Sequence, residues 1–227
     1  MSSNEKLGVI DSGTMITFSS TCLMNVFVNF VKKNKLTLLV SNDVASESVW
    51  KPLNNKRFAL NAARIKHLFN SGVVKVIPAN DSDPLEDKIL SIANSCFYSN
   101  GQPITIIQRG EAEALALAKI NNANILFIDE RTTRSLFENP FRLKQVLEKR
   151  RQENIVLKME KVNLLKSMFP DLKIFRSVDI IALAYEQDLF DGEFDKGKLE
   201  LEAALYSTKF AGCSVSEREI EEYLAGK

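Results

Sequence analysis

Two acidic residues in this chain directly follow short apolar runs. Asp11 comes after LGVI at 7–10, and Asp129 comes after ILFI at 125–128. Two more acids belong to predicted helices: Glu47 follows the apolar run 36–40, and Glu111 begins a helix over 110–121. The carboxyl ends of parallel strands meet at one edge of an α/β sheet, where ligands bind. We therefore expect these four carboxylates to converge.

Convergent carboxylates repel one another and raise each other's pKa values unless a cation is present. The chain has a single histidine, His67, so the expected ligands are carboxylate oxygens, which suit Mg²⁺ or Mn²⁺ rather than zinc. Such an ion lowers the pKa of a bound water and neutralises charge developing on a phosphate. The pattern predicts metal-dependent hydrolysis of a phosphodiester bond.

Each acid also has a purely structural interpretation. Asp11 fits a turn or a helix cap, and Asp129 fits an ion pair with Arg131. Glu111 and Glu113 both complement the dipole at a helix start, and residues two apart on a helix point in different directions. The residues alone do not choose between these two glutamates. We predict that Asp11→Asn or Asp129→Asn abolishes cleavage. The fold should stay as stable or become more stable, because removal of a carboxylate relieves repulsion in the metal-free protein.

The elements that must position these acids follow from hydrophobic periodicity. Buried strands are predicted at 7–10, 36–40, 73–77 and 125–128. Helices are predicted at 19–34, 56–70, 84–98 and 110–121, with Ser41 and Asn42 capping a further helix that carries Glu47 and Trp50. Strands that alternate with helices indicate an α/β fold with a mostly parallel sheet.

After Asp129 the chain becomes helical and basic. Helical periodicity covers 131–169 with a break near Asn139-Pro140, a short strand is predicted at 172–175, and Ser216 with Glu219 forms a capping-box pattern before the last helix. We predict a catalytic domain at 1–136, a basic helical insertion or extension at 137–176, and C-terminal helices at 177–227 that pack on the same domain.

Charge is distributed unevenly along the chain. Residues 131–176 contain 12 Lys and Arg against 5 Asp and Glu, whereas residues 177–227 contain 5 against 12. A basic block suits a polyanionic partner, although a solvated helical face offset by the acidic tail explains it equally well. Three widely spaced cysteines, no secretory leader and no long apolar stretch predict a soluble protein of a reducing cytoplasm, with no membrane partner.

Three segments together resemble PIN-domain proteins, a family that includes VapC-like toxin nucleases and many archaeal and bacterial members. They are VIDSGTMI (9–16), VSNDVASESVW (40–50) and GEAEALALAKINNANILFIDERTTRSL (110–136). In this resemblance Asp11 is the first acid and Ser12 the hydroxyl residue that follows it, and Glu47 is the second acid. The spacing of Glu111 and Asp129 matches the family's third and fourth acids, so the resemblance favours Glu111 over Glu113.

The sequence departs from the small toxins of that family in two ways. The third acid is Glu rather than Asp, and the acid after Asp129 is the adjacent Glu130 rather than a residue two positions on. Whether one or two metal ions bind, and whether Glu113 or Glu130 assists, is therefore open.

The resemblance implies a PIN-like parallel sheet flanked by helices, with an added C-terminal helical portion. It also implies Mg²⁺ or Mn²⁺ at the four acids, endonucleolytic cleavage of RNA and a homodimer. Some members are toxins held inactive by a small antitoxin, which makes an antitoxin a candidate partner. Ser12 and the basic block would contact the RNA, the basic residues at its phosphates. These are Arg131, Arg134, Arg142, Lys144, Lys149, Arg150 and Arg151.

Two other functions fit parts of the pattern. A non-catalytic PIN-like RNA-binding or assembly module needs the same fold without the reaction. A phosphotransferase with Asp11 as nucleophile is disfavoured, because Gly13 occupies the position where such enzymes commonly have a second Asp. The chain has neither GxxxxGK[ST] nor GxGxxG, which disfavours the common nucleotide-binding folds.

Overall fold

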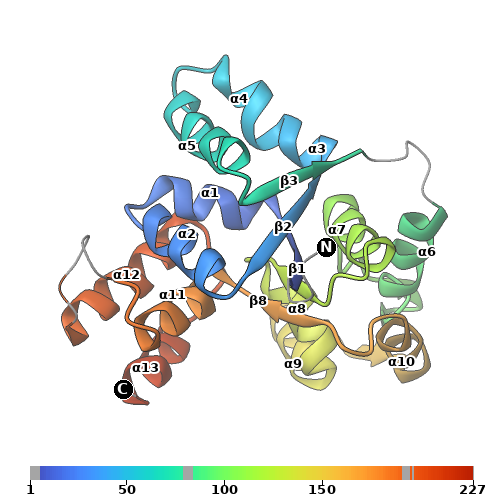
Figure 1. The fold of residues 1–227 in the computed structure, drawn as a ribbon. Helices are drawn as coiled ribbons and strands as arrows, with labels where there is room; N and C mark the ends of the chain where they lie inside the picture. The colour runs from blue at the N-terminus through green and yellow to red at the C-terminus, as the bar shows by residue number, and fades with distance from the viewer. Residues whose placement is uncertain (1–5, 79–83, 191–194, 196, 227) are drawn as a thin grey trace.

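The structure, a computed structural model, describes residues 6–78, 84–190, 195 and 197–226. The chain forms an α/β fold around a five-stranded parallel sheet with strand order β3-β2-β1-β6-β8 (Figure 1). The strands are β1 (Lys6–Ile10), β2 (Leu36–Ser41), β3 (Val74–Ile77), β6 (Ile125–Phe127) and β8 (Lys173–Phe175). The predicted α/β class and the five predicted strands are confirmed, and no strand end differs by more than one residue.

The inner strands β1, β2 and β6 are largely buried on both faces, which explains their apolar runs, whereas the edge strands β3 and β8 are partly exposed. Successive residues of β1 face opposite sides: Val9 belongs to one hydrophobic core and Ile10 to the other. Leu38 and Leu39 in β2 divide in the same way. The sheet is therefore the middle of three layers.

Helices cover each face of the sheet, as Figure 1 shows. The layer on the Ile10 face contains α1 (Ser12–Ser20), α2 (Met24–Lys33), α5 (Ala59–Asn70), α11 (Ser177–Glu186), α12 (Lys198–Ala211) and α13 (Glu217–Ala225). The layer on the Val9 face contains α6 (Pro84–Ala93), α7 (Arg109–Ile120), α8 (Arg131–Glu138), α9 (Pro140–Arg151) and α10 (Met159–Met168). Three short elements follow β2: α3 (Asn42–Ala45), the π-helical segment η1 (Ser46–Trp50) and α4 (Lys51–Leu53).

Two predicted helices differ from the structure. The helix predicted at 19–34 is divided between α1, which begins at Ser12, and α2. The helix predicted at 84–98 ends at Ala93, and the following residues form strand β4 (Phe97–Ser99). β4 pairs antiparallel with β5 (Gln102–Pro103) and β7 (Ile155–Leu157) in a second, three-stranded sheet.

The predicted basic segment 137–176 contains α9, β7, α10 and the sheet strand β8. The capping box predicted for the last helix is present, because Ser216 Oγ accepts from Glu219 N at 3.3 Å and Ser216 N donates to Glu219 Oε2 at 3.0 Å. The outer bounds of the predicted domains, residues 1 and 227, lie outside the described residues. Within the described ranges, no helix is both long and apolar enough to cross a membrane.

Candidate carboxylate site

Asp11 lies at the carboxyl end of β1 and caps the start of α1. Its backbone N–H donates to Phe127 O at 2.9 Å, which ties the end of β1 to the neighbouring β6. Its Oδ2 accepts from Gly13 N at 3.0 Å, so the residue is also a helix cap. Both interpretations of Asp11 from the sequence thus apply to the same side chain: it caps α1 and it faces the edge where parallel strands present ligands.

An acidic cavity of about 500 Å³ opens beside Asp11. Its walls come from α1, α3, η1, α4, α6 and α7, and no lining residue belongs to the chain after α7. The lining residues are Asp11, Ser12, Asp43, Val44, Glu47, Lys51, Glu86, Arg109, Gly110 and Glu113. Three residues predicted for the site, Asp11, Ser12 and Glu47, therefore line one cavity. Carboxylates outnumber cations among its lining residues.

The π-helical segment η1 positions Glu47 on the wall of this cavity. Ser41 caps the preceding helix by accepting from Val44 N at 3.1 Å, which is the cap that the sequence predicted. Ser48 Oγ donates to Val44 O at 2.6 Å, a side-chain bond to the preceding turn of the kind that often bends helices. Single π-helical turns are rare and occur frequently at functional sites.

Glu111 and Glu113 point to different neighbours, as their spacing on α7 requires. Glu111 accepts from Gln108 N at 2.6 Å in a capping box and from the Thr133 hydroxyl on α8. Glu113 lines the acidic cavity instead, and its Oε1 is buried with no hydrogen-bond partner among the described residues. Glu113 is therefore the α7 glutamate that faces the cavity, while Glu111 holds α7 against α8.

Asp129 follows β6 and is only 5% exposed. Its Oδ2 accepts from the hydroxyls of Thr17 at 2.7 Å and Ser177 at 2.9 Å, and its Oδ1 accepts from Ser177 N at 2.6 Å. These bonds join the end of β6 to α1 and to the start of α11. Arg131, the partner that the sequence suggested for Asp129, instead approaches Glu219 at 3.9 Å.

Asp11 interacts electrostatically with Glu47, which lines the cavity, and with Asp129, which does not. Burial raises the pKa of Asp11, hydrogen bonds from the backbone of Gly13 and Ser12 lower it, and the carboxylates of Asp129 and Glu47 raise it. The charge of Asp11 in turn raises the pKa of Glu111, although neither Glu111 nor Asp129 lines the cavity.

Both glutamates of α7 are raised in pKa, each by burial first. For Glu111 the Thr133 hydroxyl lowers the pKa, and the carboxylates of Glu130 and Asp11 raise it. For Glu113 the Ser41 hydroxyl opposes the rise, and the carboxylates of Asp43, Glu86 and Glu47 add to it. Protonation is thus favoured at three positions where a bound cation would offer the alternative compensation.

The carboxylate oxygens that the structure describes in this cavity are suitable ligands for a hard divalent cation, but they do not form a complete coordination site. Carboxylate oxygens are the ligands that Mg²⁺ and Mn²⁺ prefer. Across the described residues, no three Asp, Glu, His or Cys side chains are grouped closely enough to hold a metal ion on their own. Mg²⁺ commonly uses one or two carboxylates together with water and substrate phosphate, so such grouping is not required for it.

The basic residues predicted to contact RNA do not line the cavity, whereas Ser12 does. Arg134 is bound in ion pairs, with Nη1 at 2.7 Å from Asp179 Oδ2 and Nε at 2.8 Å from Glu138 Oε2. Lys144 approaches Glu148 at 3.5 Å within α9. Arg142, Lys149, Arg150 and Arg151 are exposed on α9, the last three in its final turn.

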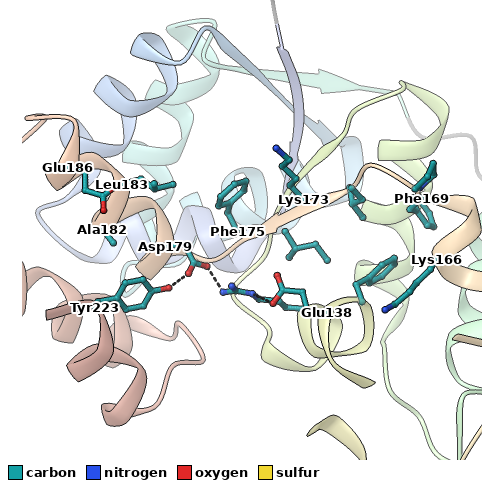
Figure 2. Close-up of a pocket in the computed structure, with 15 residues that line it drawn as sticks. Glu138, Lys166, Phe169, Lys173, Phe175, Asp179, Ala182, Leu183, Glu186 and Tyr223 are labelled. Carbon is teal, nitrogen blue, oxygen red and sulfur yellow. Dashed lines mark hydrogen bonds and ion pairs between the residues drawn. The ribbon is translucent and has the colours of Figure 1, made fainter. Parts of the chain in front are cut away.

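The ion pairs of Arg134 form one wall of a second cavity, of about 570 Å³ (Figure 2). Figure 2 shows Asp179 beside Tyr223, with Phe175 and Phe169 also lining the cavity. Arg134 forms an ion pair with the same Asp179 carboxylate. The Tyr223 hydroxyl donates to Asp179 Oδ1, and burial followed by the Asp179 charge raises the pKa of Tyr223 to about 12. This network binds α8, α11 and α13 together and supplies no acid to the carboxylate site.

Several cavity residues were not predicted from the sequence. Asp43 lies in the first turn of α3, and Lys51 follows η1. Arg109 Nε lies 2.8 Å from Glu86 Oε1, an ion pair that joins the starts of α7 and α6. Their positions in the sequence could have indicated them. Each belongs to the first turn of a helix or to the segment that follows β2, and both regions adjoin the carboxyl edge of the sheet.

Comparison with protein families, with characterised proteins and with solved structures finds no match to this chain. The assignment of function therefore depends on the residues and their geometry.

Proposed function

We propose that this protein is a PIN-like, Mg²⁺- or Mn²⁺-dependent endoribonuclease. The single observation that carries the proposal is the position of Asp11. Its carboxylate lies at the carboxyl edge of a parallel sheet, lines an open acidic cavity with Glu47, and is close enough to Asp129 and Glu47 for their charges to act on it. The resemblance of three segments to PIN domains supplies RNA as the substrate.

Asp11, Glu47 and Glu113 would hold the ion from the cavity side, with Glu111 and Asp129 behind them. A bound divalent ion lowers the pKa of its water and offsets charge on a phosphate. Ser12 lines the same cavity beside Asp11 and is available to a phosphate oxygen. The described residues orient the site through the hydrogen bonds of Asp129 and Glu111, which fix α1, α8 and α11 around Asp11.

The proposal is tested by cleavage of labelled RNA with Mn²⁺. Asp11→Asn should reduce the rate by roughly 100-fold or more, because a Lewis-acid metal contributes several kcal/mol to such reactions. Asp171→Asn is the matched control, since Asp171 is exposed and lies outside the cavity. Full activity in Asp11→Asn would contradict the site.

The alternative is a non-catalytic PIN-like module that binds RNA or mediates assembly. One observation favours it: Asp129 and Glu111 already hold structural hydrogen bonds, which a module without catalysis would also need. Absence of Mn²⁺-dependent cleavage by the wild type on varied RNA substrates would support this alternative. A toxin role, an antitoxin partner and a homodimer stay predictions of the resemblance.

A further inference from the structure

A basic and aromatic surface lies beside the acidic cavity, on the segment between β2 and β3. Residues 48–80 contain six Lys and Arg and no Asp or Glu, which makes this stretch more uniformly basic than α9 and its surroundings. Trp50 and Phe58 in this stretch are 47% and 46% exposed, unusually high for large aromatic side chains. We call this the basic-aromatic surface; it comprises Trp50, Lys51, Lys56, Arg57, Phe58 and Lys66.

Two of the four cations of this surface lie over its aromatic rings. Lys66 Nζ is 5.7 Å from the centroid of the Trp50 ring, and Arg57 Cζ is 5.4 Å from that of Phe58. In the part of the chain that the structure describes, none of its four cations is within ion-pair distance of a carboxylate. Their charges are therefore available to an anionic partner.

The basic-aromatic surface is continuous with the cavity through η1 and α4. Glu47 and Lys51 both line the cavity, and Trp50 lies between them on the same helical segment. η1 and α4 pack against α5, which carries Lys66 (Figure 1). Trp50 thus lies three residues from Glu47 and next to Lys51 along the segment that forms this cavity wall.

Two other surfaces combine some of these features and lack the rest. The last turn of α9 carries three basic residues, and in Figure 1 α9 lies far from α4 and α5. Phe210 on α12 is 80% exposed with Lys209 Nζ 5.8 Å from its ring centroid, but it belongs to the acidic segment 177–227. Neither surface contributes a residue to the acidic cavity.

We propose that the basic-aromatic surface binds single-stranded RNA and leads it into the acidic cavity. Trp50 and Phe58 stack on unpaired bases, and Lys51, Lys56 and Arg57 contact phosphates. Aromatic platforms beside a basic track are how proteins hold single strands, whereas a duplex keeps its bases stacked inside. The inference rests on the proposed function and names the form of its substrate and the surface that binds it.

The single tryptophan of the chain makes the contact directly measurable. Titration of Asp11→Asn protein with a single-stranded oligoribonucleotide in EDTA should quench the fluorescence of Trp50, because a base stacks on its ring. A perfectly paired duplex of the same length should bind more weakly and quench less. Equal or tighter duplex binding, or single-strand binding without a change in fluorescence, would overturn the inference.

Variants assign the binding to these side chains. Trp50→Ala should weaken single-strand binding by roughly 5- to 100-fold, the range for loss of one stacked base, and Trp50→Phe should restore most of it. Phe210→Ala is the matched control, an exposed ring under a lysine elsewhere, and should bind as the wild type. Unchanged affinity in Trp50→Ala, measured by anisotropy of a labelled strand, would refute the stacking role.

The charged contacts are tested by salt dependence. The double variant Lys56→Ala, Arg57→Ala should lower the slope of log affinity against log salt by about 1.4, which corresponds to two phosphate contacts on a single strand. Alanine at Lys149, Arg150 and Arg151 should leave that slope unchanged. The opposite result, a lower slope only in the α9 variant, would move the RNA surface to α9 and overturn the inference.

Binding in EDTA and cleavage with Mn²⁺ separate the two proposals. Cleavage that persists in Trp50→Ala with unaltered RNA affinity would refute the binding surface and leave the nuclease intact. Single-strand binding through Trp50 with no cleavage by the wild type would refute the nuclease and leave the binding surface intact.

Discussion

Asp129→Asn should destabilise the fold even though it removes a buried negative charge. Asp129 accepts three hydrogen bonds, from the Thr17 hydroxyl, the Ser177 hydroxyl and the Ser177 backbone N–H. An asparagine offers one acceptor oxygen and places an NH₂ group where the other oxygen was. If the asparagine oxygen keeps the bond from Ser177 N–H, its NH₂ faces the hydroxyls of Thr17 and Ser177. These hydroxyls must then rotate to accept, and their own O–H donors lose the carboxylate that accepted from them. Because of these bonds, we expect Asp129→Asn to lower the stability of the fold, whereas repulsion alone predicts that it raises it.

The magnitude follows from the bonds that are lost. A hydrogen bond to a charged group contributes about 1.5–3 kcal/mol, and a buried donor left without an acceptor costs about 1–3 kcal/mol. Relief of repulsion with Asp11 offsets part of this loss, so the net destabilisation should be about 2–4 kcal/mol. For a chain of 227 residues this lowers Tm by roughly 4–16 °C.

Thermal and urea unfolding in EDTA measure this change without a metal contribution. Asp11→Asn is the paired variant, because burial and neighbouring carboxylates raise the pKa of Asp11 and its remaining oxygen still accepts from Gly13 N. Above its folded pKa, the ionised Asp11 destabilises the fold, so Asp11→Asn should be as stable as the wild type or more stable. Equal or greater stability in Asp129→Asn would refute the structural role of its three bonds.

Three further predictions concern the other acids. Burial acts to raise the pKa of Glu219, but hydrogen bonds in the capping box of α13 and the charge of Arg176 lower it to about 2. Glu219 thus stabilises the fold above pH 4.5 and loses that effect as pH falls toward 2. Glu219→Gln should lower the free energy of unfolding by about 2–3 kcal/mol near neutrality. In urea unfolding at several pH values, the variant should show a weaker loss of stability between pH 4.5 and 2 than the wild type. In EDTA, differential scanning calorimetry should show a larger rise in Tm for Glu113→Gln than for Glu111→Gln, because the Glu111 oxygens have hydrogen-bond partners that Glu113 Oε1 lacks; the reverse order would contradict their assigned contacts. At pH 8, Mn²⁺ at 100 times its Kd should add about 2.7 kcal/mol to stability, and the same Mn²⁺ concentration should add less as pH falls, because protons compete at Asp11, whose pKa is raised; a gain independent of pH would argue against binding there.

The sequence predicted the central sheet because its inner strands are largely buried on both faces and therefore stand out as apolar runs. Helix α1 did not stand out, since its buried face mixes Thr14, Thr17 and Ser19 with Met15 and Phe18 and shows no clear stripe. Small polar residues are buried there because α1 packs against Asp129 and α12, a long-range condition that local periodicity does not contain.

The small antiparallel sheet was missed for a related reason. β4, β5 and β7 are three residues long or less, and β4 pairs with β7 across more than fifty residues of chain. The apolar periodicity of the preceding α6 continues to Phe97, so nothing local separates helix from strand. Pairing partners far along the chain decided the outcome.

The candidate site was predictable in its positions and less so in its contacts. Asp11 and Glu47 face the cavity because strand ends and the helix after β2 define the edge of the sheet. The choice between Glu111 and Glu113 depended on Thr133, a residue on α8 that binds Glu111 and turns it away from the cavity. No spacing within α7 contains that information.

The basic block was the least informative signal. Net charge identified 131–176, yet Arg134 and Lys144 have carboxylate partners, and the cations without one near the cavity belong to 48–80. Averages over the longer segment 1–130 concealed that stretch, because acids elsewhere in the segment balance it. Uninterrupted charge over a shorter window would have indicated it.

The most direct test of the account is the position of Mn²⁺ in a crystal of the protein soaked in that ion. Anomalous scattering locates Mn²⁺ without ambiguity from water. We expect a peak bonded to a carboxylate oxygen of Asp11 on the cavity side, absent from crystals of Asp11→Asn. A fully occupied Mn²⁺ site elsewhere, with none at Asp11, would contradict the carboxylate cluster as the metal centre.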